Sequence, residues 1–150
     1  MPFEEKLTWV NLVVTLGVAA TYFTAVLTPL GEVAAAEIAY QRPLLIAVGA
    51  SIVLTIVGAI LTAIATAVSG EIAGRDATAD IERKDERDAD INRRGDLLGY
   101  YVASAGAVGV MAPTILEADY SWIANALYLS FVIGGLVGSV AKIVSYRRGF

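Results

Sequence analysis

Charged residues are absent from four long stretches of the chain, and this segregation is its strongest pattern. The four stretches without Asp, Glu, Lys or Arg are Leu7–Gly31, Pro43–Val68, Leu97–Leu116 and Tyr120–Ala141. Each reaches the roughly 20 residues with which an α-helix crosses about 30 Å of hydrocarbon. Their apolar residues do not alternate with polar ones, which disfavours barrel strands. The pattern predicts an all-α polytopic membrane protein, a four-transmembrane-helix bundle in a single domain of residues 1–150.

The composition agrees with this environment and removes much chemistry. Of the 150 residues, 57% are hydrophobic and 17% are charged, whereas an ordinary soluble domain has about 25% charged residues. The lipid bilayer is therefore an expected partner. The chain contains no Cys and no His, which excludes disulfides, zinc–thiolate sites, haem–histidine ligation and catalysis by Cys or His. Since the net charge is −4, we expect no direct nucleic-acid binding, and we also expect no enzyme activity, no cofactor and no metal.

The distribution of Lys and Arg predicts an orientation in the membrane. With four spans, both termini lie on the same side as the connection between the second and third spans. That side holds every Lys and Arg of the chain except Arg42. Because basic residues are retained on the cytoplasmic side, we expect both termini and this connection to face the cytoplasm.

Residues 69–96 form the charged insert between the second and third spans. More than half of all charged residues lie within it, with acids and bases interleaved. Acid-to-base pairs four residues apart, which support a helix, occur at Glu71–Arg75, Asp80–Lys84 and Asp90–Arg94. The pattern predicts that helices two and three extend beyond the membrane as a charged cytoplasmic projection. The alternatives of a helical hairpin and a surface helix both remain open.

Small residues at four-residue spacing mark candidate helix-packing faces. Ser130, Gly134 and Gly138 form such a face on the fourth span, and Gly95 and Gly99 form another at the start of the third. Small residues let helix backbones approach closely inside a membrane. The fourth-span face is expected to pack within the chain, with a homo-oligomer as the alternative. Asn125 in the same span is interpreted as an interhelical hydrogen-bonding residue, with a ligand contact as the alternative.

Three stretches of the chain carry a resemblance to a known family. They are residues 84–91 (KDERDADI, followed by Arg94 and Gly95), residues 122–129 (WIANALYL) and residues 142–150 (KIVSYRRGF). In order and spacing they resemble a family of uncharacterised four-span bacterial inner-membrane proteins. The resemblance implies location in the bacterial inner membrane and proximity of the genes to those of small helix-turn-helix regulators. It implies no reaction.

Charges near the ends of spans three and four predict a candidate ion-pair or docking surface on the expected cytoplasmic side. The Asp-Glu-Arg-Asp run precedes span three and the Arg pair ends span four, so antiparallel packing would bring them together. The candidate residues are Lys84, Asp85, Glu86, Arg87, Asp88, Asp90, Arg94, Arg147 and Arg148. The arginines could equally contact anionic lipid headgroups. We expect a non-enzymatic membrane protein, a regulatory subunit or one that docks a cytoplasmic regulator or another membrane protein, with a small oligomeric channel or transporter as the alternative.

Overall fold

The computed structural model of the protein describes residues 3–72 and 86–148. All of their regular secondary structure is helical, without a strand in either range. The long helices are α1 (Phe3–Leu27), α2 (Gln41–Ile72), α4 (Glu86–Gly109) and α6 (Tyr120–Arg148), and the short ones are η1 (Thr28–Gly31), η2 (Ala35–Glu37) and α5 (Met111–Ile115). By length and composition, four helical segments suffice to cross a membrane, α4 and α5 counting together as one. The expectation of an all-helical chain with four such segments is confirmed.

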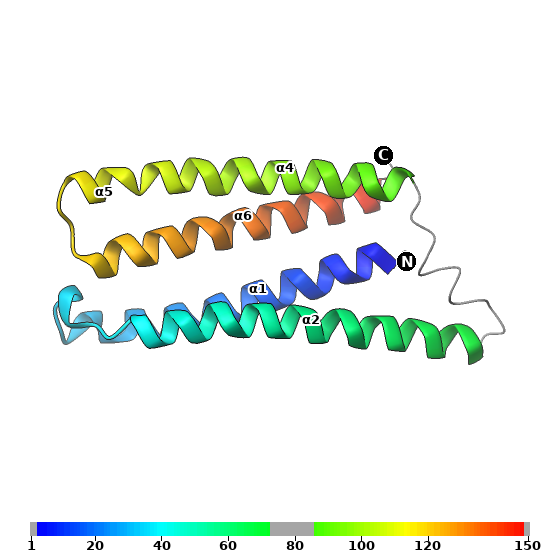
Figure 1. Cartoon of the computed structure of the whole chain (residues 1–150), viewed down its shortest axis with the longest axis horizontal. Coiled ribbons are helices and arrows are strands. Elements are labelled where there is room, and N and C mark those ends of the chain that lie inside the picture. Colours follow the sequence, from blue (N-terminus) through cyan, green and yellow to red (C-terminus); the bar gives the residue numbers. More distant parts are fainter. Residues whose placement is uncertain (1–2, 73–85, 149–150) are drawn as a thin grey trace.

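Two prolines explain why helices α1 and α4 end before the corresponding apolar stretches of the sequence end. A proline cannot donate a backbone hydrogen bond, and its ring collides with the carbonyl four residues earlier. Pro113 opposes the carbonyl of Gly109, and α4 ends at that glycine before α5 begins at Met111. Pro29 likewise follows the end of α1 and lies in the 3₁₀ turn η1. The apolar stretches 7–31 and 97–116 are therefore each divided near the end that lies away from the chain termini (Figure 1).

The end of α2 and the start of α4 test the prediction that these two helices extend into the charged insert. Helix α2 continues to Ile72, beyond the apolar stretch that ends at Val68, and α4 begins at Glu86, well before Leu97. Both helices thus extend past the charge-free segments, as expected. The predicted pair Asp80–Lys84 and the partner Arg75 of Glu71 lie outside the described residues.

The four long helices form an open row rather than a closed bundle. Helix α4 packs along α6, α6 along α1 and α1 along α2, whereas α2 and α4 do not pack along each other in the described ranges. Figure 1 shows the order α4, α6, α1, α2, with both chain termini at one end. In α2 the only buried residue is Ala47. The expected bundle therefore differs from the structure, because among the long helices α2 packs along α1 alone in the described ranges and leaves most of its large apolar residues exposed.

Helices α4 and α6 approach each other through glycines. A Cβ atom placed on Gly99 would lie 2.7 Å from the carbonyl oxygen of Gly134, and one on Gly138 would lie 3.0 Å from that of Gly95. At Gly106 it would meet the Ser130 side chain at 2.6 Å. Such backbone contact gives dispersion energy and Cα–H···O contacts that larger residues would prevent. The antiparallel pair α4–α6 is consequently held in a single register.

An aromatic cluster joins α1 to α6 at the opposite end. The ring of Tyr22 packs edge-on against Phe23 and Tyr128, with centroid separations of 5.2 and 4.9 Å. Buried Val26 and Ala47 complete the cluster, so it also anchors the start of α2. Tyr22 is the only aromatic residue that is buried among the described residues.

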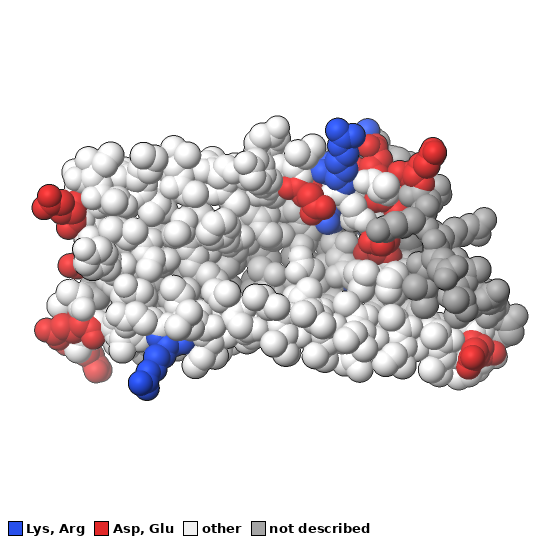
Figure 2. Space-filling model, viewed as in Figure 1, with Lys and Arg blue, Asp and Glu red and all other residues white. Residues whose placement is uncertain are grey.

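Charge gathers at the two ends of the row and is sparse between them. Figure 2 shows mixed acidic and basic side chains at one end, mostly acidic ones at the other and a wide uncharged band between. The acidic end carries Glu32, Glu37, Glu117 and Asp119, with Arg42 as its base. We call the other end, which holds Glu4–Lys6, the start of α4 and the end of α6, the charged end.

Candidate functional site at the charged end

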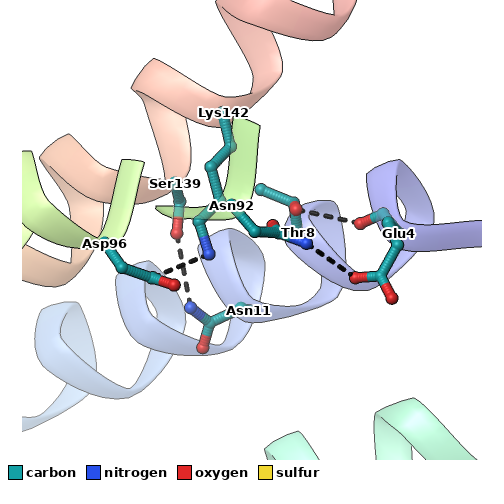
Figure 3. A network of polar contacts seen from close by, with 7 residues as sticks. All are labelled: Glu4, Thr8, Asn11, Asn92, Asp96, Ser139 and Lys142. Atoms are coloured by element: carbon teal, nitrogen blue, oxygen red, sulfur yellow. Dashed lines mark hydrogen bonds and ion pairs between the residues drawn. The ribbon is translucent and has the colours of Figure 1, made fainter. Parts of the chain in front are cut away.

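Glu4 of α1 ties the start of this helix to α4. The Asn92 Nδ2 atom donates a 3.0 Å hydrogen bond to Glu4 Oε2. The Thr8 hydroxyl donates to the backbone carbonyl of Glu4 at 2.9 Å (Figure 3). A carboxylate in the first helical turn is also favoured by the helix dipole. Glu4 therefore combines a role at the α1 terminus with a link between helices that are not neighbours in the row.

Glu5 is a buried carboxylate between the helices. Only 8% of its side chain is exposed, and Arg147 Nε of α6 lies 3.5 Å from Glu5 Oε1. The Arg147 side chain is 68% exposed, so the pair joins a buried acid to an exposed cation. A buried charge requires such a partner, because its desolvation costs several kcal/mol. Glu5 and Arg147 thus link α1 to α6.

A second ion pair links α4 to α6 one helical turn deeper. Lys142 Nζ lies 2.8 Å from Asp96 Oδ1. The Lys142 stem lies over Gly95, where a Cβ atom would collide with its Cγ atom. Nearby, Asn11 Nδ2 of α1 donates to the buried Ser139 hydroxyl at 3.3 Å (Figure 3). These contacts extend the polar network inward as far as the edge of the charge-free band.

The polar network therefore consists of side chains from three helices, and all of them except Thr8, which donates within α1, are paired across a helix boundary. Its members are Glu4, Glu5, Thr8, Asn11, Asn92, Asp96, Ser139, Lys142 and Arg147. It holds the ends of α1, α4 and α6 in register. Lys6 adds α2 through a 3.1 Å hydrogen bond from Nζ to the Thr66 hydroxyl.

The predicted docking residues lie around this network, at the start of α4 and the end of α6. Lys84 and Asp85 fall outside the described residues, while Glu86, Arg87, Asp90, Arg94 and Arg148 are exposed. Asp90 and Arg94 form the predicted ion pair at 2.8 Å. Asp88 is half-buried and lies close to the Tyr146 hydroxyl of α6.

Among the described residues, neither Arg147 nor Arg148 forms the expected ion pair with an acid at the start of α4. Arg147 pairs with Glu5 of α1, a helix that sequence reasoning left out of the cluster. Glu4, Asp96 and Lys142 were not predicted as members of the polar network. The one signal in the sequence that marks them is position, since each lies within a few residues of the border of a charge-free stretch. Border charges that face a neighbouring helix are candidates for interhelical pairs.

The candidate packing residues lie on two faces of α6. Gly134 and Gly138 contact α4, and the Ser130 side chain meets Gly106 of α4. This small-residue face is therefore occupied within the chain. Asn125 accepts a 2.8 Å hydrogen bond from the Tyr22 hydroxyl through Oδ1 and donates to the Ser121 carbonyl at 2.7 Å.

Comparison with protein-family models, with curated proteins and with solved structures found no match to this chain.

Proposed function

We propose that the protein is a small non-enzymatic membrane protein of the bacterial inner membrane, with both termini in the cytoplasm, that acts as a regulatory or partner-docking subunit. The observation that carries the proposal is the two-layer organisation of the charged end. An inner layer of paired side chains fixes three helix ends, and an outer layer of exposed charges lies on α4 and α6.

The outer layer has cations to offer a partner. Arg93 and Arg148 are exposed and form no ion pair with the described part of the chain. Exposed arginines are well suited to bidentate contacts with the carboxylates of a partner. Because the inner layer holds α4 and α6 together, these groups are presented on a defined surface rather than on independent helix ends.

The uncovered α2 gives a second route of association, inside the membrane. Its apolar residues are exposed along most of the helix, and four threonines of α1 and α2 satisfy their hydroxyls locally. These are Thr21, Thr24, Thr62 and Thr66, whose hydroxyls donate to carbonyls of their own helices. A subunit that associates with another membrane protein uses such a surface, whereas a channel or transporter requires polar groups along its path.

The proposal is tested by recovering partners with the tagged full chain after cross-linking in membranes. We compare wild type with the double variant R93Q/R148Q, and we use R42Q at the acidic end as the matched control. We expect at least about tenfold less partner with R93Q/R148Q, as the loss of charge-assisted contacts predicts, and unchanged recovery with R42Q. Equal recovery with all three chains would contradict the proposal.

A further inference from the structure

A groove of about 290 Å³ runs along α6 between α4 and α1. Its floor is made by Gly134, Gly135 and Gly138, and Tyr100 and Ala103 of α4 line one side. Gly135 is exposed, and a Cβ atom there would meet nothing nearer than Thr15 Cγ2 at 3.9 Å. The absence of a side chain at Gly135 therefore leaves this part of the groove open, whereas Gly134 and Gly138 pack against the α4 backbone at its edge.

One end of the groove is polar and the other is apolar. Asn11, Asp96, Ser139 and Lys142 line the end nearest the charged surface, and Phe131 lines the far end. The twelve residues of α6 from Phe131 to Lys142 are separated by eleven steps of about 1.5 Å, which correspond to about 16 Å. Half of the hydrocarbon core is about 15 Å. The groove thus has the length of one acyl chain in one leaflet, and its polar end lies at headgroup level.

The charges at the polar end favour a headgroup with both a cation and an anion. Lys142 and Asp96 sum to zero, which offers no advantage to a lipid with a net charge. Lys142 occupies one Asp96 oxygen, and the Asp96 side chain is 72% exposed, so its carboxylate can accept further hydrogen bonds. Lys142 Nζ and Asn11 Nδ2 are donors beside it, and both suit a phosphate oxygen.

We propose that this groove is a binding site for one phospholipid whose headgroup carries a primary ammonium group. The ammonium donates to Asp96, the phosphate accepts from Lys142 and Asn11, and one acyl chain lies over Gly135 toward Phe131. A choline headgroup of the same net charge fits less well, because its quaternary nitrogen has no hydrogen to donate. The site is independent of the proposed docking role.

The test uses the purified full chain, exchanged into mixed micelles with equal amounts of ethanolamine, choline and glycerol phospholipids, and then repurified. Retained lipid is quantified by mass spectrometry. We expect roughly tenfold enrichment of the ethanolamine lipid over the choline lipid, as charge-assisted hydrogen bonds to one carboxylate give. No enrichment, or enrichment of the anionic glycerol lipid instead, would overturn the proposal.

Two variants separate the groove from general lipid contact. G135L fills the groove from an exposed position and is expected to abolish retention, whereas G49L, a matched change where a Cβ atom meets nothing within 4 Å, leaves it unchanged. D96N keeps the shape of the side chain and is expected to equalise ethanolamine and choline lipids. Unchanged retention in G135L, or unchanged selectivity in D96N, would refute the site.

Discussion

Helices α4 and α6 and helices α1 and α2 are both antiparallel pairs, but they are held together in different ways. The first pair meets backbone to backbone at Gly99 and Gly134. In the second pair the closest glycine, Gly58, meets only the side chain of Val10, and α2 buries one residue. Since lipid supplies no hydrophobic drive between helices, close packing decides which pair is stable. We infer that α4–α6 is the rigid part of the row and that α2 is its weakly attached edge.

The largest expected effect is that of G134L. A side chain at this position would meet the Ala103 Cβ atom and the Gly99 carbonyl oxygen, both at 2.7 Å from the new Cβ atom. Because backbone cannot give way as a side chain can, we expect a loss of about 3 kcal/mol in the free energy of unfolding, measured by denaturant titration in micelles. G49L is the control and is expected to stay within about 0.5 kcal/mol of wild type. Similar losses in both variants would remove the distinction between the two pairs.

G58L tests the weaker pair with the same substitution. A Cβ atom at Gly58 would collide with Val10 Cγ1, but this methyl group can move and α2, at the edge of the row, can shift outward. We therefore expect a loss of only about 1.5 kcal/mol, together with greater protease access to α2 in the same micelles. A loss as large as that of G134L would show that α1–α2 is as tightly fitted as α4–α6.

R147A extends the comparison to the polar network that joins the two pairs through α1 and α6. The substitution leaves the Glu5 carboxylate buried without its cation. Since Arg147 itself is largely exposed and therefore screened, we expect a loss of about 1 kcal/mol rather than the full cost of a buried charge. The neighbouring R148A, which removes an exposed arginine without a described ion pair, is expected to change stability by less than about 0.5 kcal/mol. Equal effects of the two variants in the same denaturant titration would count against the Glu5–Arg147 link.

The sequence predicts the packing of α4 against α6 better than it predicts the position of α2 at the edge of the row. The spacing of Gly95 and Gly99 and of Gly134 and Gly138 marks faces that need a close neighbour, and the short connection between the helices supplies one. The sequence contains no comparable signal for which helices are neighbours in the row. Helix α2 is apolar on every side, and in a membrane each of its sides could face lipid equally well. A four-helix bundle was therefore the natural expectation, whereas one copy of the chain leaves α2 at the edge.

The sequence predicts that charged residues gather at the candidate site, but it does not predict which of them pair with one another across helices. That charges would gather at one end follows from the charge-free stretches. The partner of Arg147 could not be chosen from the sequence, because Glu5 becomes its neighbour only when α1 packs beside α6. Asn92 and Glu4, which are 88 residues apart in the chain, depend on the same packing. Pairings across helices require the order of the row, which local spacing does not contain.

E117G is expected to have the smallest effect and to strengthen the rigid pair instead of weakening it. Glu117 has a φ of 53°, a left-handed conformation that costs residues other than glycine about 1–2 kcal/mol. The Ala118 N–H donates to the Pro113 carbonyl at 2.9 Å, and the Glu117 N–H to that of Thr114 at 3.2 Å, the Schellman arrangement that favours glycine at this position. Because glycine also gains freedom in the unfolded chain, the net gain should be about 0.5 kcal/mol, seen as a higher denaturant midpoint. E117A removes the same charge without relieving the backbone and is expected to give no gain. A gain in E117A equal to that in E117G would mean that charge, and not backbone conformation, limits the stability of this turn.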